Sequence, residues 1–344
     1  MIADRYYYGR LTTKEKQIYK DFYSGIKNCE NIIRTIPMPN PDKVMDRVFT
    51  AIIADNPHIY YLEQTQIRYV YSPLGIEIHP TYVFPKSQIA AYNQQFQDKA
   101  NEIVSAVIAE AGSDELKREK ALYEYFAKNF TYDKAALNTK DPIALCKAHS
   151  LIGVFLEGKA VCEGFSKAFK FLMNAMDMKC IVVTGYADWD YASGHAWNIV
   201  KLNNKPYHVD VTWAISRNDD GIVWYDYLNV SDQTISIDHS GFTGVPKCNS
   251  DDLDFYKTVA PKIDNTIYLK NHIKQCLKQK EDVTTFMLVK GSGKCGISNL
   301  QDGPMLCQEA AARAHREAGG GGFQFNLQYM EKKGIYTIIF TYDN

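Results

Sequence analysis

The sequence predicts an α+β protein of two or three domains, and three observations lead to this prediction. Apolar residues recur every three to four positions in several long segments, which is the spacing of amphipathic helices. Other segments alternate, or are rich in Tyr, Ile and Val between turn residues, which is typical of strands. The chain has 344 residues, and at roughly 100–200 residues per domain this length suggests two or three domains.

Residues 1–90 are predicted to form an N-terminal α+β accessory domain. Thr12 and Glu15 have the spacing of a capping box, and an apolar stripe of helical period follows them. A second helical stripe lies at 44–53. Residues 58–84 then alternate around a Ser-Pro-Leu-Gly turn, which predicts two strands that form a hairpin.

Residues 91–258 are predicted to form the central core domain. A long helix is expected to end just before Gly112, and Ser113 is the expected cap of the helix that follows. Residues 134–150 are predicted to form a loop. The run KCIVVTGY at 179–186 predicts a buried strand.

Residues 259–344 are predicted to form a C-terminal α+β accessory domain. Helical periodicity and Ala-rich composition indicate two helices, and β-rich runs indicate a strand and a closing hairpin. The expected elements are a helix near 266–280, a strand near 282–290, a helix near 305–317 and a hairpin from 322 to 342.

Charge and composition exclude several classes of partner. Lys and Arg number 39 against 40 Asp and Glu, so no basic field points to nucleic acid or to an anionic membrane surface. No apolar run approaches the roughly 20 residues that span a bilayer. The start of the chain lacks a signal-peptide stretch, so we expect a cytoplasmic protein, or a secreted or surface-exposed one whose signal has been removed.

The eight cysteines do not have the spacing of a metal site. They are scattered and include no CxxC pair, which argues against zinc and against a dense disulfide framework. We therefore expect no metal and no cofactor. Most of these cysteines are expected to be reduced core residues, because free cysteine packs as a small hydrophobe.

Cys162 has the local surroundings of a nucleophile. A glycine-containing turn precedes it, and a helix with an apolar face follows it. A thiol at a helix start is assisted because free N–H groups and the helix dipole stabilise the thiolate. The alternative for this position alone is a buried core cysteine.

A histidine and an aspartate follow in positions that suit a catalytic triad. Strands are expected at 195–201 and 206–213, joined by a two-residue turn. In such a hairpin, opposite residues have numbers with an odd sum, and the numbers of His195 and Asp210 have an odd sum. The two side chains should therefore share one face. His208 passes the same test, but it is not an acid and is expected to be a structural or rim residue.

These residues lie in a pattern that resembles the transglutaminase-like superfamily, over about residues 100–245. Three runs carry the resemblance: GKAVCEGFSKAF at 158–169, GHAWNIV at 194–200 and YHVDVTW at 207–213. The resemblance implies a transglutaminase-like core, which is a papain-like core with permuted strand order. It also implies that Cys162 is the nucleophile, His195 the base and Asp210 the acid that orients the base.

The resemblance further implies attack of the thiol on an amide of a protein or peptide substrate, with a thioester acyl-enzyme as intermediate. Water would complete the reaction of a cysteine peptidase or amidase, the bacterial type of this superfamily. A lysine amine would make the chain a crosslinking transglutaminase. We favour hydrolysis because the sequence contains no calcium loop and bacterial relatives are mostly assigned as peptidase-like. A catalytically silent protein-binding module is the third alternative. The oligomeric state is left open.

Three further residues are candidates for the oxyanion site or the substrate groove. Family members often place a polar side chain before the nucleophile motif, and His149 is the candidate here, with a plain loop histidine as the alternative. Its proposed companion is the backbone N–H of Cys162. Trp197 and Trp213 are candidate groove walls, with core aromatics as the alternative. Ala214 follows where relatives tend to carry acidic residues, so the groove is expected to differ from theirs.

Overall fold

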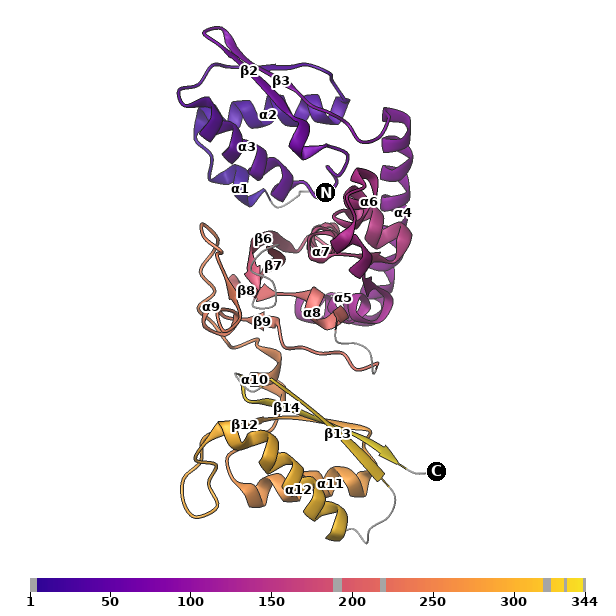
Figure 1. The fold of residues 1–344 in the computed structure, drawn as a ribbon, viewed down its shortest axis with the longest axis vertical. Helices are drawn as coiled ribbons and strands as arrows, with labels where there is room; N and C mark the ends of the chain where they lie inside the picture. The colour runs from indigo at the N-terminus through magenta and orange to yellow at the C-terminus, as the bar shows by residue number, and fades with distance from the viewer. Residues whose placement is uncertain (1–4, 188–193, 217–220, 318–322, 331–332, 343–344) are drawn as a thin grey trace. The chain divides into compact units, whose positions relative to one another are not determined.

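The computed structural model is an α+β fold that divides into two compact units, Met1–Ser250 and Asp251–Asn344. Figure 1 shows helices and strands in both units. The structure describes residues 5–187, 194–216, 221–317, 323–330 and 333–342. The division into three domains with boundaries near residues 90 and 258 stays a prediction.

The first unit begins with helices and a small antiparallel sheet. The capping box is confirmed, because the Thr12 hydroxyl accepts from the N–H of Glu15 and the Glu15 carboxylate accepts from the N–H of Thr12. The hairpin is also confirmed, and a short strand joins it in the order β1-β3-β2. The elements are α1 (Tyr6–Gly9), α2 (Thr13–Asn28), β1 (Ile33–Thr35), α3 (Pro41–Asp55), η1 (Gln64–Gln66), β2 (Arg68–Ser72) and β3 (Gly75–His79).

The helices that follow show two corrections to the sequence analysis. Asp114, not Ser113, caps α5, because its carboxylate accepts from the N–H of Lys117 at 3.0 Å. The segment expected to be a loop at 134–150 is largely helical, because Asp133 and Asp141 each cap a short helix there. The elements are α4 (Lys86–Ala111), α5 (Glu115–Asn129), β4 (Thr131–Tyr132), η2 (Lys134–Asn138), α6 (Pro142–Ala148), η3 (Gly153–Glu157) and β5 (Lys159–Ala160).

A five-stranded antiparallel sheet with order β10-β6-β7-β8-β9 forms the centre of the first unit. Helix α7 packs on β6 and β7, and Asn198 ties it to the sheet by donating to the carbonyl oxygens of Ser166 and Ile181. The elements are α7 (Cys162–Ala175), β6 (Lys179–Ala187), β7 (His195–Leu202), β8 (Lys205–Val209), α8 (Val211–Ser216), β9 (Leu228–Val230), α9 (Asp232–Ile235) and β10 (His239–Ser240).

The hairpin of β7 and β8 is confirmed, but its second strand is shorter than the predicted 206–213. Asn203 and Asn204 form the two-residue turn with φ of 48° and 63°, as a type I′ turn requires. The strand ends at Val209 because the Asp210 carboxylate accepts from the N–H of Thr212 at 2.9 Å, and α8 begins there. Asp210 therefore lies where a strand ends and a helix begins.

The N-terminal helices contact the central sheet directly. Asp55, at the end of α3, accepts from the backbone N–H groups of Tyr7 and Tyr8 at 3.1 and 2.8 Å. The Tyr7 hydroxyl in turn donates to the carbonyl oxygen of Val182 in β6 at 2.6 Å. These bonds attach the first helices to the sheet that carries the candidate site.

The second unit has a four-stranded sheet with order β11-β12-β14-β13, against which α11 and α12 pack. The helices, strand and hairpin expected in this part of the chain are confirmed. The elements are α10 (Phe255–Val259), β11 (Lys262–Ile263), α11 (Thr266–Gln279), β12 (Val283–Leu288), η5 (Leu300–Asp302), α12 (Gly303–Glu317), β13 (Phe323–Met330) and β14 (Ile335–Tyr342). In the described part of the chain, no helix is both long and apolar enough to cross a bilayer.

Candidate active site

Cys162 is the first residue of α7, and it is partly exposed at one end of the central sheet. Four of the other cysteines are buried, so their thiols have no access to solvent. A cleft of about 600 Å³ opens over Cys162, and His195 and Trp213 also line it. The sequence-predicted nucleophile therefore combines a helix N-terminus with access to a cleft.

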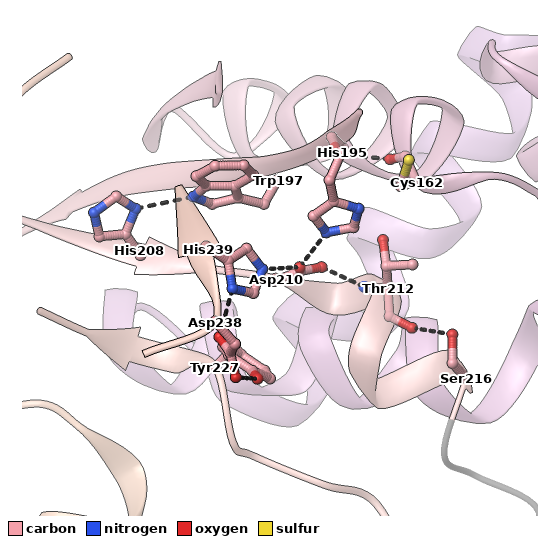
Figure 2. Close-up of polar contacts among 11 residues, drawn as sticks. Cys162, His195, Trp197, His208, Asp210, Thr212, Ser216, Tyr227, Asp238 and His239 are labelled. Carbon is pink, nitrogen blue, oxygen red and sulfur yellow. Dashed lines mark hydrogen bonds and ion pairs between the residues drawn. The ribbon is translucent and has the colours of Figure 1, made fainter. Parts of the chain in front are cut away.

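His195 lies between the other two members of the predicted triad. Its Nε2 donates to Oδ2 of Asp210 over 2.6 Å, and both side chains are buried. Figure 2 shows that the other ring nitrogen, Nδ1, points toward the sulfur of Cys162. The strand register explains this arrangement: β7 and β8 pair Asn198 with Val209, so His195 and Asp210 occupy diagonal positions on one face.

The charges of this group support one another. Burial lowers the pKa of His195, but the charge and hydrogen bond of Asp210, together with Cys162, raise it to about 10. Burial raises the pKa of Asp210, yet His195 and His239 hold it below its ordinary range. An imidazolium beside a thiol stabilises the thiolate, which is the nucleophilic form.

His239 is a member of this group that the sequence analysis missed. Its Nε2 lies 3.2 Å from Oδ2 of Asp210, and its Nδ1 lies 2.7 Å from Oδ1 of Asp238. The Tyr227 hydroxyl donates to Oδ2 of Asp238 over 2.5 Å. His239 lies on β10, outside the three motifs, and only the pairing of β10 with β6 brings it to the site. No local sequence signal indicates this pairing.

His149 lies at the end of α6 and lines the cleft, and its role there stays a prediction. Its Nδ1 lies 2.9 Å from Glu163, and the ammonium of Lys167 lies 2.6 Å from the other oxygen of Glu163. Burial raises the pKa of Glu163, but Lys167 and His149 lower it to about 2. A second cavity of about 460 Å³ adjoins the first, and His149 lines both.

The structure separates the two tryptophans that were candidate groove walls. Trp213 lines the cleft beside Cys162. Trp197 is only 1% exposed, and its ring stacks on that of His195 with centroids 5.8 Å apart. Its indole N–H donates to Nδ1 of His208 over 3.0 Å. Trp197 therefore lies behind His195 and supports its ring, whereas Trp213 faces the cleft.

Among the residues that the structure describes, two groups of side chains bring potential metal ligands together, and their hydrogen bonds decide what they can bind. In the first, Trp197 donates to Nδ1 of His208, so the neutral ring carries its proton on Nε2 and donates it to Asp232 over 2.9 Å. A metal would need that nitrogen unprotonated. In the second, His195, Asp210 and His239 would have to give up two hydrogen bonds. Neither set fits a resident metal.

Comparison with known proteins identifies the family of the central part of the chain. Residues 101–213 match the family model of the Transglutaminase-like superfamily. The chain is 27% identical over 166 residues to the kyphoscoliosis peptidase of Mus musculus and 29% identical over 140 residues to that of Homo sapiens. The matches cover 46% and 38% of this chain but 23% and 20% of these relatives. The chain thus spans less than a quarter of the length of either.

Solved structures also resemble parts of the chain. One is a TGase, at 21% identity and a TM-score of 0.31, with 54% of this chain and 50% of that chain covered. Another is the periplasmic domain of TgpA from Pseudomonas aeruginosa bound to ethylmercury, at 16% identity and a TM-score of 0.28, with 46% and 66% covered. The three motifs lie within the family match, and residues 101–213 form a transglutaminase-like domain.

Proposed function

We propose that the chain is a thiol-dependent acyl-transfer enzyme that acts on protein or peptide amides, with hydrolysis as its reaction. Cys162 is the nucleophile, His195 the general base and acid, and Asp210 the group that orients His195. One observation carries this proposal: His195 donates to Asp210 through Nε2 while its Nδ1 points toward the Cys162 sulfur. That is the relation of nucleophile, base and orienting acid on which triad chemistry depends.

The reaction begins with the Cys162 thiolate and the His195 imidazolium. The sulfur attacks the amide carbon, and a C–S bond forms as the carbonyl oxygen becomes an oxyanion. The C–N bond then breaks as Nδ1 of His195 gives its proton to the leaving amine, which leaves a thioester. Water attacks the thioester while His195 takes one of its protons. The acid product leaves, and the thiolate–imidazolium pair is restored.

The oxyanion needs hydrogen-bond donors in the cleft. The backbone N–H of Cys162 is one, because the first N–H groups of a helix have no acceptor within it. His149 is the proposed second donor. Its Nδ1 donates to Glu163, so Nε2 donates to the substrate oxygen when the ring is an imidazolium with a proton on each nitrogen. The second cavity beyond His149 offers room for the substrate chain on one side of the scissile bond.

Hydrolysis and amine transfer share the same thioester, so they differ only in what attacks it. Both curated relatives that the chain matches are named peptidases, which supports water as the acceptor. The crosslinking alternative needs a lysine amine to reach the thioester through the same cleft. The catalytically silent module needs Cys162 to be unreactive.

The first experiment tests the thiol itself. Limited iodoacetamide at mildly acidic pH is followed by peptide mapping of all eight cysteines. Cys162 should be labelled well before Cys295, which is exposed and serves as the matched control. Equal labelling of these two cysteines would refute the activated thiol at Cys162.

The second experiment separates the reactions. The full chain is incubated with casein and a biotinylated primary amine, with Cys162→Ala and Cys295→Ala chains alongside. New peptide termini that depend on Cys162 support hydrolysis, and biotin on casein glutamines supports crosslinking. Neither product, despite selective alkylation of Cys162, would remove casein-type proteins from the substrate class. Equal activity of the Cys162→Ala chain would refute the proposed nucleophile.

A further inference from the structure

We propose that His239 is a positioning residue for the triad, held as an imidazolium between Asp238 and Asp210, and that it sets the orientation of the Asp210 carboxylate. The proposal rests on the proposed function, because it concerns how the acid of the triad is held. It adds His239 and Asp238, which lie outside the three motifs, to the predicted triad.

The hydrogen bonds around His239 require two protons on its ring. Its Nδ1 faces Asp238 at 2.7 Å and its Nε2 faces Asp210 at 3.2 Å. An ionised carboxylate is only an acceptor, so each ring nitrogen must donate. A neutral ring could donate in only one of these two contacts. In the other contact, an unprotonated ring nitrogen would face a carboxylate oxygen, and both atoms are acceptors.

Three of the four carboxylate oxygens accept from donors other than His239, so only Oδ1 of Asp238 could carry the proton in place of the ring. Asp210 accepts from the N–H of Thr212 at Oδ1 and from His195 at Oδ2. Asp238 accepts from the Tyr227 hydroxyl at Oδ2. Burial and Asp238 raise the pKa of Tyr227 above its ordinary value, so that the hydroxyl keeps its proton and donates. A carboxyl group is a stronger acid than an imidazolium, so the proton shared between Asp238 and the ring belongs to His239.

The surroundings of His239 suit a buried cation. The side chain is fully buried, and aromatic rings surround it: Trp197 at 5.0 Å from β7, Tyr227 at 5.1 Å from the segment before β9 and Trp213 at 6.2 Å from α8. Aromatic faces stabilise a desolvated cation. The titratable groups that face it are Asp210, Asp238, Tyr227 and His195, whose ring centroid lies 5.4 Å away. His208 also lies close enough for the charge of His239 to lower its pKa.

His208 provides a matched comparison within the same sheet. It is as buried as His239 and also bonds an aspartate, but Trp197 donates to its Nδ1, so this ring is neutral with its proton on Nε2. Burial lowers the pKa of His208 to about 4, against the opposite effect of Asp232. The two histidines thus differ in the partner of one nitrogen: an indole donor for His208 and a carboxylate for His239.

A cation at His239 has two effects on His195. It holds Oδ2 of Asp210 at the point where Nε2 of His195 donates, which orients the base. It also lies close enough to oppose the proton on His195, so its removal should strengthen the hold of Asp210 on that proton. His239→Gln should therefore lower the rate at which Cys162 is alkylated and move the deprotonation of His195 to higher pH.

The direct test reads the protonation of the ring without any substrate. The full chain is labelled with ¹⁵N-histidine, and long-range ¹H–¹⁵N spectra are recorded near neutral pH, with His239 assigned by its loss in His239→Gln and His208 by its loss in His208→Gln. We expect both nitrogens of His239 to carry protons and His208 to be a neutral Nε2–H tautomer. A neutral ring at His239 would overturn the proposal. If His239→Gln does not fold, Asp238→Asn supplies the assignment, because removal of this carboxylate changes the partner of Nδ1 of His239 and moves the signals of that ring.

The second readout is the pH profile of alkylation of Cys162 by iodoacetate. This anionic reagent is attracted by the His195 imidazolium, so its rate falls when His195 loses its proton. The alkaline limb should move up by about one pH unit in His239→Gln, the size of a neighbouring-charge effect, and stay in place in His208→Gln. An unmoved limb in His239→Gln would refute the positioning role. If Cys162 of the unaltered chain shows no selective alkylation, the proposed function fails, and the ¹⁵N spectra still decide the state of His239.

Discussion

His195 and Asp210 are joined by a 2.6 Å hydrogen bond although they are not opposite each other in their hairpin. The register shifts Asp210 by two positions from the partner of His195, and the strand ends just before it. The carboxylate therefore spans a diagonal, with one oxygen on His195 and the other on the N–H of Thr212. This double attachment fixes the acid from both sides of the strand end.

Replacement of Asp210 by Asn should remove the orienting charge while it keeps the shape. The amide cannot stabilise the His195 imidazolium, and we expect the rate of amide hydrolysis to fall by about 10⁴-fold, as orienting-acid replacements do in other triads. The measurement is kcat/KM for casein cleavage, followed by the release of a product peptide. Asp232→Asn, which changes the carboxylate beside His208 instead, is the control and should lose far less. Similar losses in both variants would contradict the special role of Asp210.

The stability contributed by His195 should depend on pH in a definite direction. Its pKa is raised to about 10 in the fold, so the protonated pair contributes fully below the unfolded value of about 6.5 and is lost as pH rises toward 10. The difference in urea midpoint between the unaltered chain and His195→Gln should therefore shrink as the pH rises. A constant difference from mildly acidic to alkaline pH would show that charge does not contribute.

Asp210 should give the opposite dependence at low pH. Its pKa is lowered in the fold, so its contribution is present above the unfolded value of about 3.9 and is lost as pH falls below that value. Acid titration of the unaltered chain and Asp210→Asn, followed by tryptophan fluorescence, should bring the two stabilities together at low pH. Parallel curves over the whole acid range would exclude a native carboxylate with a lowered pKa.

Glu163→Gln should loosen His149 and leave the buried Lys167 ammonium without its anion. We expect a loss of about 2 kcal/mol in the free energy of unfolding, since a buried charged donor loses its partner. Urea titration measures this loss. Lys167→Met should rescue part of it in the double variant, because the uncompensated charge is then absent. If the loss in the double variant equals the sum of the losses in the two single variants, the ion pair is not the cause.

Gly185→Ala tests how closely the strands behind the triad must approach. Gly185 pairs with His195, and a Cβ there would lie 2.3 Å from the carbonyl oxygen of Ser240 and 2.8 Å from the Trp197 ring. We expect a loss of roughly 1–3 kcal/mol in stability, as for overpacking, and slower alkylation of Cys162. Gly9→Ala is the control, because its Cβ would meet nothing. Unchanged alkylation in Gly185→Ala would show that the site tolerates a shift of β10.

The parts of the site that depend on local periodicity could be predicted from the sequence. The two-residue turn at 203–204 and the period of two along strands were enough to place His195 and Asp210 on one face. The helix that begins at Cys162 followed from its apolar stripe. The catalytic roles of these residues stay predictions until the thiol is tested.

The parts that depend on long-range pairing could not be predicted. His239 reaches the site because β10 pairs with β6, and a strand of two residues has no sequence signature. The length of β8 was overestimated because its alternation continues through Asp210, where the aspartate begins a helix instead. The helix at Pro142–Ala148 was missed because it is too short for its periodicity to stand out.

The strand order of the central sheet decides which fragment of the chain would keep the sheet complete. β9 and β10 are its two edge strands, and both follow residue 213, where the family match ends. A fragment of residues 101–213 would keep Cys162, His195 and Asp210 but would lose both edges, and with them His239. The first compact unit, Met1–Ser250, keeps both edge strands, His239 and the hydrogen bond from α1 to β6.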